Sequence, residues 1–182
     1  MQEIIQKIHQ SPFKVTIVSS GGGTEAISSL LQVPGASNTI LESYIPYAKE
    51  SMDAYLNKKP DHYCSMQTCL SMAANAYKSC SSIAKNTKSK HLLGIAITAS
   101  LATTYKKIGD HKFFIALQTS SYTKSIECIL DKNTRSRKEE EMLIADYVMH
   151  LLGEACGIKV AKPSHDEDIH IYKTMAEKSW IK

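Results

Sequence analysis

The feature that most constrains the fold is a strand, a glycine-rich loop and a helical pattern that follow one another over residues 13–31. Residues 13–18 alternate and are rich in β-branched side chains, which predicts a strand. Ser19-Ser20-Gly21-Gly22-Gly23 ends this strand, and residues 24–31 have the periodicity of a helix. A strand joined to a helix by so short a loop is typical of an α/β sheet.

The rest of the chain extends this unit. Helical patterns cover residues 1–10, 47–56, 65–84 and 135–154. Extended patterns cover residues 38–45, 91–98, 112–118 and 122–130, and the last two are joined like a hairpin. The order predicts a three-layer α/β/α domain with a mixed sheet over residues 1–158. Residues 159–182 are predicted to be a charged tail with room for a final helix.

The composition of the chain argues against several classes of function. The 182 residues fit one domain, and the net charge of +4 permits a small anionic ligand but not a nucleic-acid footprint. We interpret the basic stretches at residues 85–90 and 132–138 as solvated connections. No apolar run is long enough for a membrane helix, the N-terminus lacks a signal-peptide pattern, and the five cysteines form no CxxC pair. We therefore expect a cytoplasmic protein with reduced thiols, and neither membrane nor nucleic acid as partner.

The glycine-rich loop is the strongest local signal for chemistry. Its backbone amides, at the start of a helix, are suited to an anion, and we expect a nucleotide phosphate or sulfate against residues 20–24. A serine there could also attack a carbonyl carbon whose oxyanion those amides would stabilise. The alternative is a glycine turn in which Ser20 caps the helix. The His165-Asp-Glu-Asp-Ile-His170 cluster has metal-binding residue types but no known ligand spacing, so we expect no metal.

Four ordered segments resemble the CinA C-terminal domain family, whose enzymes are nicotinamide-nucleotide amidohydrolases. Thr16 to Ala26, with the turn at residues 31–37, is similar to the family's TAESCTGG opening and its VPGSS-type turn. Tyr44 to Lys49 is similar to its Tyr-Ser-Asn-x-x-Lys stretch, and residues 94–100 resemble its AVTGIAG segment. The surroundings of Arg137 resemble its GDR segment, with Arg135 as a close rival for that position.

The resemblance implies an amidohydrolase that converts nicotinamide mononucleotide, or a related pyridine nucleotide, to the acid and ammonia. Ser19 would be the nucleophile, Lys49 its buried base and Tyr44 the proton relay. Substrate contacts would come from Ser20, Gly21, Gly22, Gly23, Thr98, Ser100 and Arg137. Such a scheme requires no cofactor, and self-association in the family implies a homodimer.

The departures from the family pattern favour a second interpretation. Val18 stands where the family has a glutamate, Pro46 stands where it has an asparagine, and Thr98 to Thr103 lacks the family's glycines. The alternative to the enzyme is therefore a catalytically inactive CinA-like module that binds or senses a nucleotide. A purely structural, oligomerising domain is a third possibility.

Overall fold

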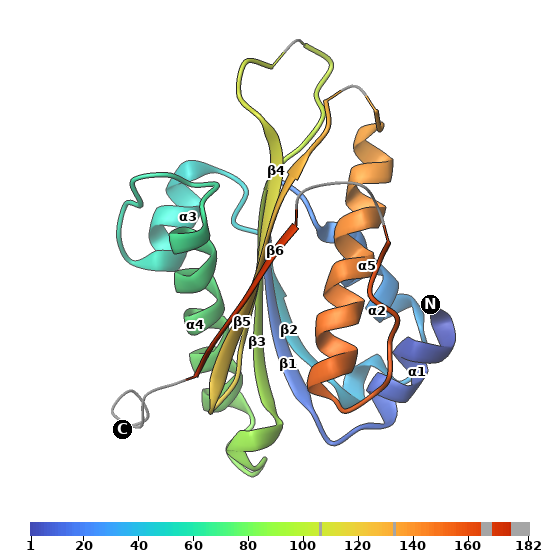
Figure 1. Cartoon of the computed structure of the whole chain (residues 1–182). Coiled ribbons are helices and arrows are strands. Elements are labelled where there is room, and N and C mark those ends of the chain that lie inside the picture. The colour runs from blue at the N-terminus through green and yellow to red at the C-terminus, as the bar shows by residue number, and fades with distance from the viewer. Residues whose placement is uncertain (106, 133, 165–168, 176–182) are drawn as a thin grey trace.

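The computed structural model describes the whole chain except residues 106, 133, 165–168 and 176–182 (Figure 1). A single six-stranded sheet runs through it in the order β2-β1-β3-β4-β5-β6. The strands are β1 (Lys14–Ser20), β2 (Ile40–Tyr44), β3 (Leu92–Ser100), β4 (His111–Gln118), β5 (Tyr122–Leu130) and β6 (Ile169–Met175). β1 is parallel to β2 and β3, and the remaining pairs are antiparallel.

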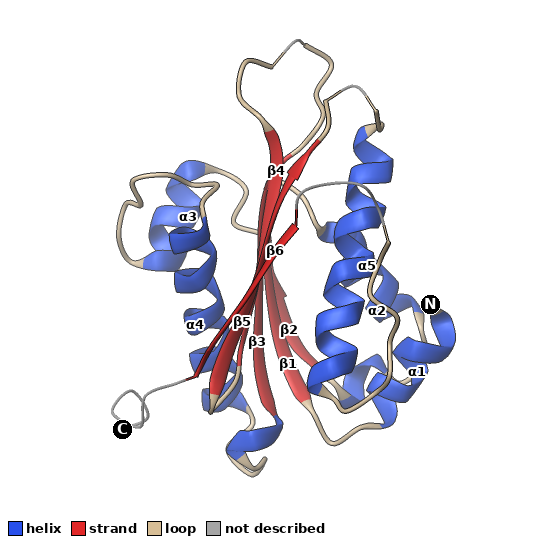
Figure 2. Ribbon diagram, in the orientation of Figure 1, coloured by secondary structure: helices blue, strands red, loops and turns tan. Residues whose placement is uncertain are grey.

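Helices cover both faces of this sheet, as Figure 2 shows. One layer contains α1 (Gln2–Gln10), α2 (Thr24–Gln32) and α5 (Arg137–Ala155). The other contains α3 (Lys49–Leu56) and α4 (Met66–Ile83). The predicted three-layer α/β/α fold with a mixed sheet is confirmed. No helix in the described ranges is long and apolar enough to cross a membrane.

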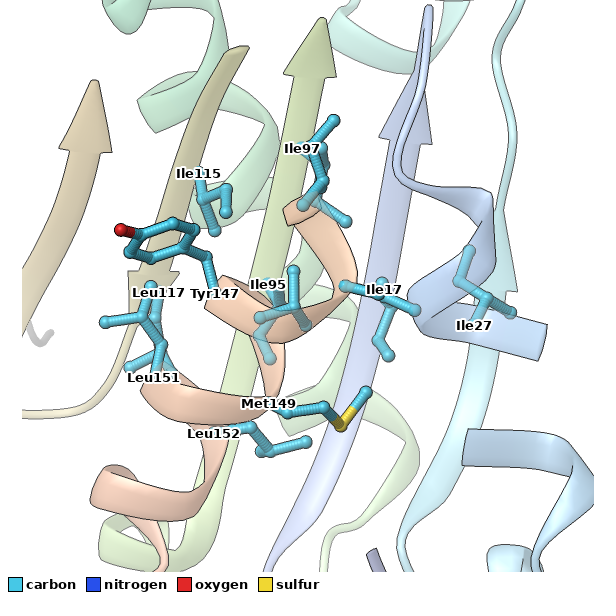
Figure 3. Packing of buried hydrophobic residues seen from close by; sticks show 14 of the residues in the cluster. Ile17, Ile27, Ile95, Ile97, Ile115, Leu117, Tyr147, Met149, Leu151 and Leu152 are labelled. Atoms are coloured by element: carbon cyan, nitrogen blue, oxygen red, sulfur yellow. The ribbon is translucent and has the colours of Figure 1, made fainter. Parts of the chain in front are cut away.

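Strand alternation divides the core in two. Along β1, Ile17 belongs to the cluster beneath α2 and α5, whereas its neighbour Val18 belongs to the cluster beneath α3 and α4. Figure 3 shows Tyr147 and Leu151 of α5 packed against Ile115 and Leu117 of β4. Because successive side chains of a strand point to opposite faces, Ser19 and Ser20 are also expected on different sides of the sheet.

Two predictions from the sequence need correction. The tail is not helical over residues 169–175, because these residues form β6, which pairs with β5 through Cys128 and Ile169 at one end. Helix α3 begins at Lys49 rather than just after Pro46, since Ala48 still has extended backbone angles. The His165–His170 segment, for which no metal was expected, lies largely on residues 165–168, outside the described residues.

Candidate functional site

One edge of the sheet brings together the ends of several elements. β1 and β3 end there, β4 begins there, and Ser100 pairs with Lys112 across the two central strands. The β3–β4 connection and the start of α5 lie at this same end (Figure 1). Ligands of α/β sheets commonly bind outside the carboxyl ends of parallel strands, so this edge is the first place to look for a site.

A large cavity, of about 950 Å³, opens at this edge. Its walls are the β3–β4 connection, the first residue of β4 and the approach to α5. Four side chains in the described lining are cationic and none is acidic; the four are Lys107, Lys132, Arg135 and Arg137. Tyr105 and Ile108 add exposed apolar surface to the same wall. The cavity therefore combines positive charge with apolar surface, which suits a phosphorylated organic molecule.

The cationic side chains of this cavity donate hydrogen bonds mainly to uncharged oxygens. Arg137 donates to the Gly21 carbonyl at 2.9 Å and to the Ala102 carbonyl at 3.3 Å. Lys107 donates to the Ser100 hydroxyl and to the Leu101 carbonyl. Lys132 and Arg137 also form long ion pairs, with Asp110 at 3.8 Å and with Glu141 at 4.0 Å. The ammonium group of Lys107 and the guanidinium group of Arg137 are therefore held mainly by neutral oxygens, which leaves their charge for an incoming anion.

The environment of the cavity lowers the pKa of Lys107. Burial lowers the pKa of its ammonium group, and the nearby charges of Arg137 and Lys132 lower it further, against an opposing effect of Glu140 and Cys64. A bound anion would favour the protonated form. We therefore expect anion binding to weaken with rising pH earlier than it would with a lysine of ordinary pKa.

Beneath the cavity lies a buried ionisable pair. Glu140, 1% exposed, accepts a hydrogen bond from the Ala102 amide at 2.6 Å and contacts His111 Nδ1 at 2.8 Å. A carboxylate can only accept, so Nδ1 is the donor. Glu140 thus ties the first turn of α5 to the loop after β3 and to the first residue of β4.

The glycine-rich loop at the end of β1 is already occupied by protein groups. The Ser19 hydroxyl is fully buried and donates to the Gly22 carbonyl at 2.5 Å. The Gly23 amide donates to Glu141 Oε2 at 2.7 Å, and the Glu25 amide lies 3.5 Å from the same oxygen. Within residues 20–24, where an anion was expected, the Gly23 amide already binds a side-chain carboxylate.

We expect Glu141→Ala to lower the free energy of unfolding by about 1–2 kcal/mol, because it removes an anion from the N-terminus of α2. Urea denaturation of this variant and of the parent measures the effect. Lys138→Ala, an exposed position one turn earlier on α5, is the matched control. Equal stability of the two variants would contradict a capping role for Glu141.

A smaller cavity of about 230 Å³ lies on the α3 side of the same edge. It is lined by Ser20, Lys49 and Thr98 among others, but Ser19 and Tyr44 are not in its lining. The Ser20 hydroxyl donates to the Pro46 carbonyl at 3.0 Å, and that of Thr98 donates to the Tyr63 carbonyl at 2.9 Å. Lys49 is exposed, with Nζ 5.8 Å from the centre of the Tyr63 ring.

The structure thus separates the three residues expected to be catalytic. The Ser19 side chain points to the α5 side, since its partner in β3 is Ile97 of that core, while Lys49 lies on the α3 side. The Tyr44 hydroxyl donates to Glu42 at 2.9 Å, and this hydrogen bond raises the pKa of the phenol. The expectation that Lys49 is buried beside Ser19 is wrong, because strand alternation places the serine on the opposite face.

The predicted substrate contacts are divided in the same way. Ser20, Gly21 and Thr98 line the small cavity and Arg137 lines the large one, where Arg135 joins it. Ser100 accepts from Lys107 at the border of the large cavity. Gly22 and Gly23 are buried beneath, where side chains of Leu101 and Ile97 leave no space for a Cβ.

Sequence reasoning missed Lys107, Lys132, His111 and Glu140. The signal was present: a basic pair follows the strand over residues 91–98, and a basic stretch precedes the last long helix. Both positions flank the edge where a parallel sheet binds its ligands. The interpretation of residues 132–138 as a solvated connection did not take into account that they lie beside the carboxyl ends of the strands.

Comparison with solved structures finds the same fold in competence/damage-inducible proteins of the CinA superfamily. A protein from Agrobacterium tumefaciens superposes with a TM-score of 0.65 at 14% identity, covering 85% of this chain and 94% of the other. One from Enterobacter asburiae gives 0.64 at 15% identity, covering 86% and 96%. A CinA superfamily protein from Enterobacter cloacae gives 0.62 at 15% identity, covering 86% and 90%. No protein-family model and no curated protein sequence matches this chain. The chain therefore has a divergent CinA-like fold.

Proposed function

We propose that this chain is a CinA-like module that binds a small phosphorylated ligand in the large basic cavity. The observation that carries the proposal is the convergence of four cationic side chains on one cavity at the carboxyl ends of β1 and β3. The hydrogen bonds of Lys107, Lys132 and Arg137 go to carbonyl or hydroxyl oxygens, so a phosphate would meet ammonium and guanidinium groups that neutral oxygens hold in place. Charge-assisted hydrogen bonds of this kind are among the strongest that proteins make.

The first ligand to try is nicotinamide mononucleotide, which the resemblance to the CinA C-terminal domain implies. The apolar wall around Tyr105 offers a surface for a planar ring, while the cationic wall would hold the phosphate. Titration calorimetry should give binding of the mononucleotide that nicotinamide riboside, which lacks the phosphate, does not show. Equal binding of the two compounds would contradict phosphate recognition.

The amidohydrolase is the second candidate, and one observation favours it. The Ser20 hydroxyl and Lys49 line the same small cavity, so a serine one position beyond the expected one faces a lysine. Ser19 is a poor nucleophile here because its hydroxyl is buried and already donates to Gly22.

Release of ammonia from nicotinamide mononucleotide separates the two candidates. For a binding module we expect no release above the blank, and Ser19→Ala should bind the ligand as the parent does. If the parent releases ammonia and Ser20→Ala or Lys49→Met abolishes it, the amidohydrolase replaces the binding module. Release that is lost only in Ser19→Ala would contradict our assignment of the buried serine.

A further inference from the structure

The hydrogen-bonded pair of His111 and Glu140 lies at the floor of the large cavity and also reaches its surface. His111 itself lines that cavity, although it is only 7% exposed. Glu140 accepts from its Nδ1 at 2.8 Å, which leaves Nε2 as the other nitrogen of the ring. A histidine whose inner nitrogen is fixed by a buried carboxylate keeps a lone pair on its outer nitrogen, as in many acid–base sites.

The surroundings of His111 come from several elements. Glu140 and Arg137 approach from α5, Lys107 from the β3–β4 connection, and Lys132 from the connection after β5. Arg135 lines the same space. A phosphoryl group held by these cations would lie in the cavity that His111 also lines, where positive charge stabilises the negative charge that develops on oxygen.

Resting on the proposed phosphate binding, we propose that His111 and Glu140 make this cavity a hydrolytic centre for phosphate esters or anhydrides. Nε2 takes a proton from a water molecule whose oxygen attacks phosphorus. The bond from phosphorus to the ligand oxygen, on the opposite side of phosphorus, breaks, and that leaving oxygen takes a proton from solvent, to which the imidazolium then returns its own. The products are orthophosphate and the dephosphorylated ligand, and water is the sole co-reactant. Glu140 acts as a positioning residue that fixes the tautomer.

The experiment measures orthophosphate released from nicotinamide mononucleotide, AMP and ADP by the parent and by His111→Asn, in buffer with EDTA. We expect release by the parent and a loss of kcat of about 100-fold or more in the variant, the usual contribution of general acid–base catalysis. Ligand affinity, measured by calorimetry, should stay close to that of the parent. His91→Asn is the control, because His91 precedes β3 at the opposite end of the sheet and packs edge-on against Phe13.

A second measurement keeps the proposal testable if His111→Asn does not fold. Glu140→Gln should lower the kcat of phosphate release more than it changes KM, because Glu140 fixes the tautomer of His111 without touching the ligand. A purely structural pair would change stability without this split. Binding of the ligands with no phosphate release overturns the hydrolytic centre and leaves the proposed function intact. Absence of binding overturns both.

Discussion

Alanine at Gly94 is expected to lower the free energy of unfolding by about 3 kcal/mol or more, the upper range for overpacking a tight core. A Cβ on this residue of β3 would lie 2.2 Å from the Tyr77 amide nitrogen and 2.5 Å from the Ala73 carbonyl oxygen of α4. Both atoms are backbone, so no side chain can rotate away. Relief requires α4 to move off the sheet, which would open the core beneath it.

Gly109→Ala is the matched control, because nothing lies within 4 Å of a Cβ there. Its backbone is not in the left-handed region, so we expect stability equal to the parent or slightly higher through a less flexible unfolded chain. Urea denaturation of both variants gives the comparison. If Gly94→Ala were as stable as Gly109→Ala, the described approach of α4 to β3 would be wrong.

The second large effect concerns ligand affinity. Lys107→Met keeps the aliphatic stem but removes the ammonium group, and we expect it to weaken binding of nicotinamide mononucleotide about 10- to 100-fold, the equivalent of one charged hydrogen bond. Lys107→Arg retains the charge and should bind much more tightly than Lys107→Met. Calorimetry measures both.

The pH dependence of binding and a control variant at a second lysine test this prediction further. Because burial lowers the pKa of Lys107, the parent should lose affinity as the pH rises, whereas Lys107→Arg should lose less. Lys112→Met is the control for general charge loss, since this lysine lies over the Phe114 ring of β4 and outside the described lining of the large cavity. Equal affinity of the parent and Lys107→Met would remove this lysine from the site.

The fold could be predicted largely from the sequence because its elements have strong local patterns. The apolar residues of β1 supply both core clusters, and the apolar stripe of α5 packs on one of them. β6 was missed although Ile169 and Ile171 alternate with His170 and Tyr172, because the charged residues around it masked the two-residue period. The need for glycine at position 94 could not be predicted, since it depends on how closely α4 approaches.

The site was harder to predict than the fold. The family motifs pointed to the β1–α2 loop, to Thr98 and to Arg137, and these residues lie at one edge of the sheet, where their role in a site stays a prediction. The motifs could not show that Glu141 fills the helix terminus or that Ser19 faces away from Lys49, because these depend on side-chain packing. His111 and Glu140, 29 positions apart, meet only when β4 and α5 pack together.

The most direct test of the central claim is to locate the phosphorylated ligand on the protein by following backbone amide NMR signals during titration with nicotinamide mononucleotide. Binding in the large cavity predicts saturable shifts at residues 102–105, 107–111 and 134–137, with smaller changes at Lys49 and at Tyr63 on the α3 side. Nicotinamide riboside should leave the signals of the cationic residues unchanged. Shifts gathered at Ser20, Lys49 and Tyr63, or no saturable shift with the mononucleotide, would contradict the account.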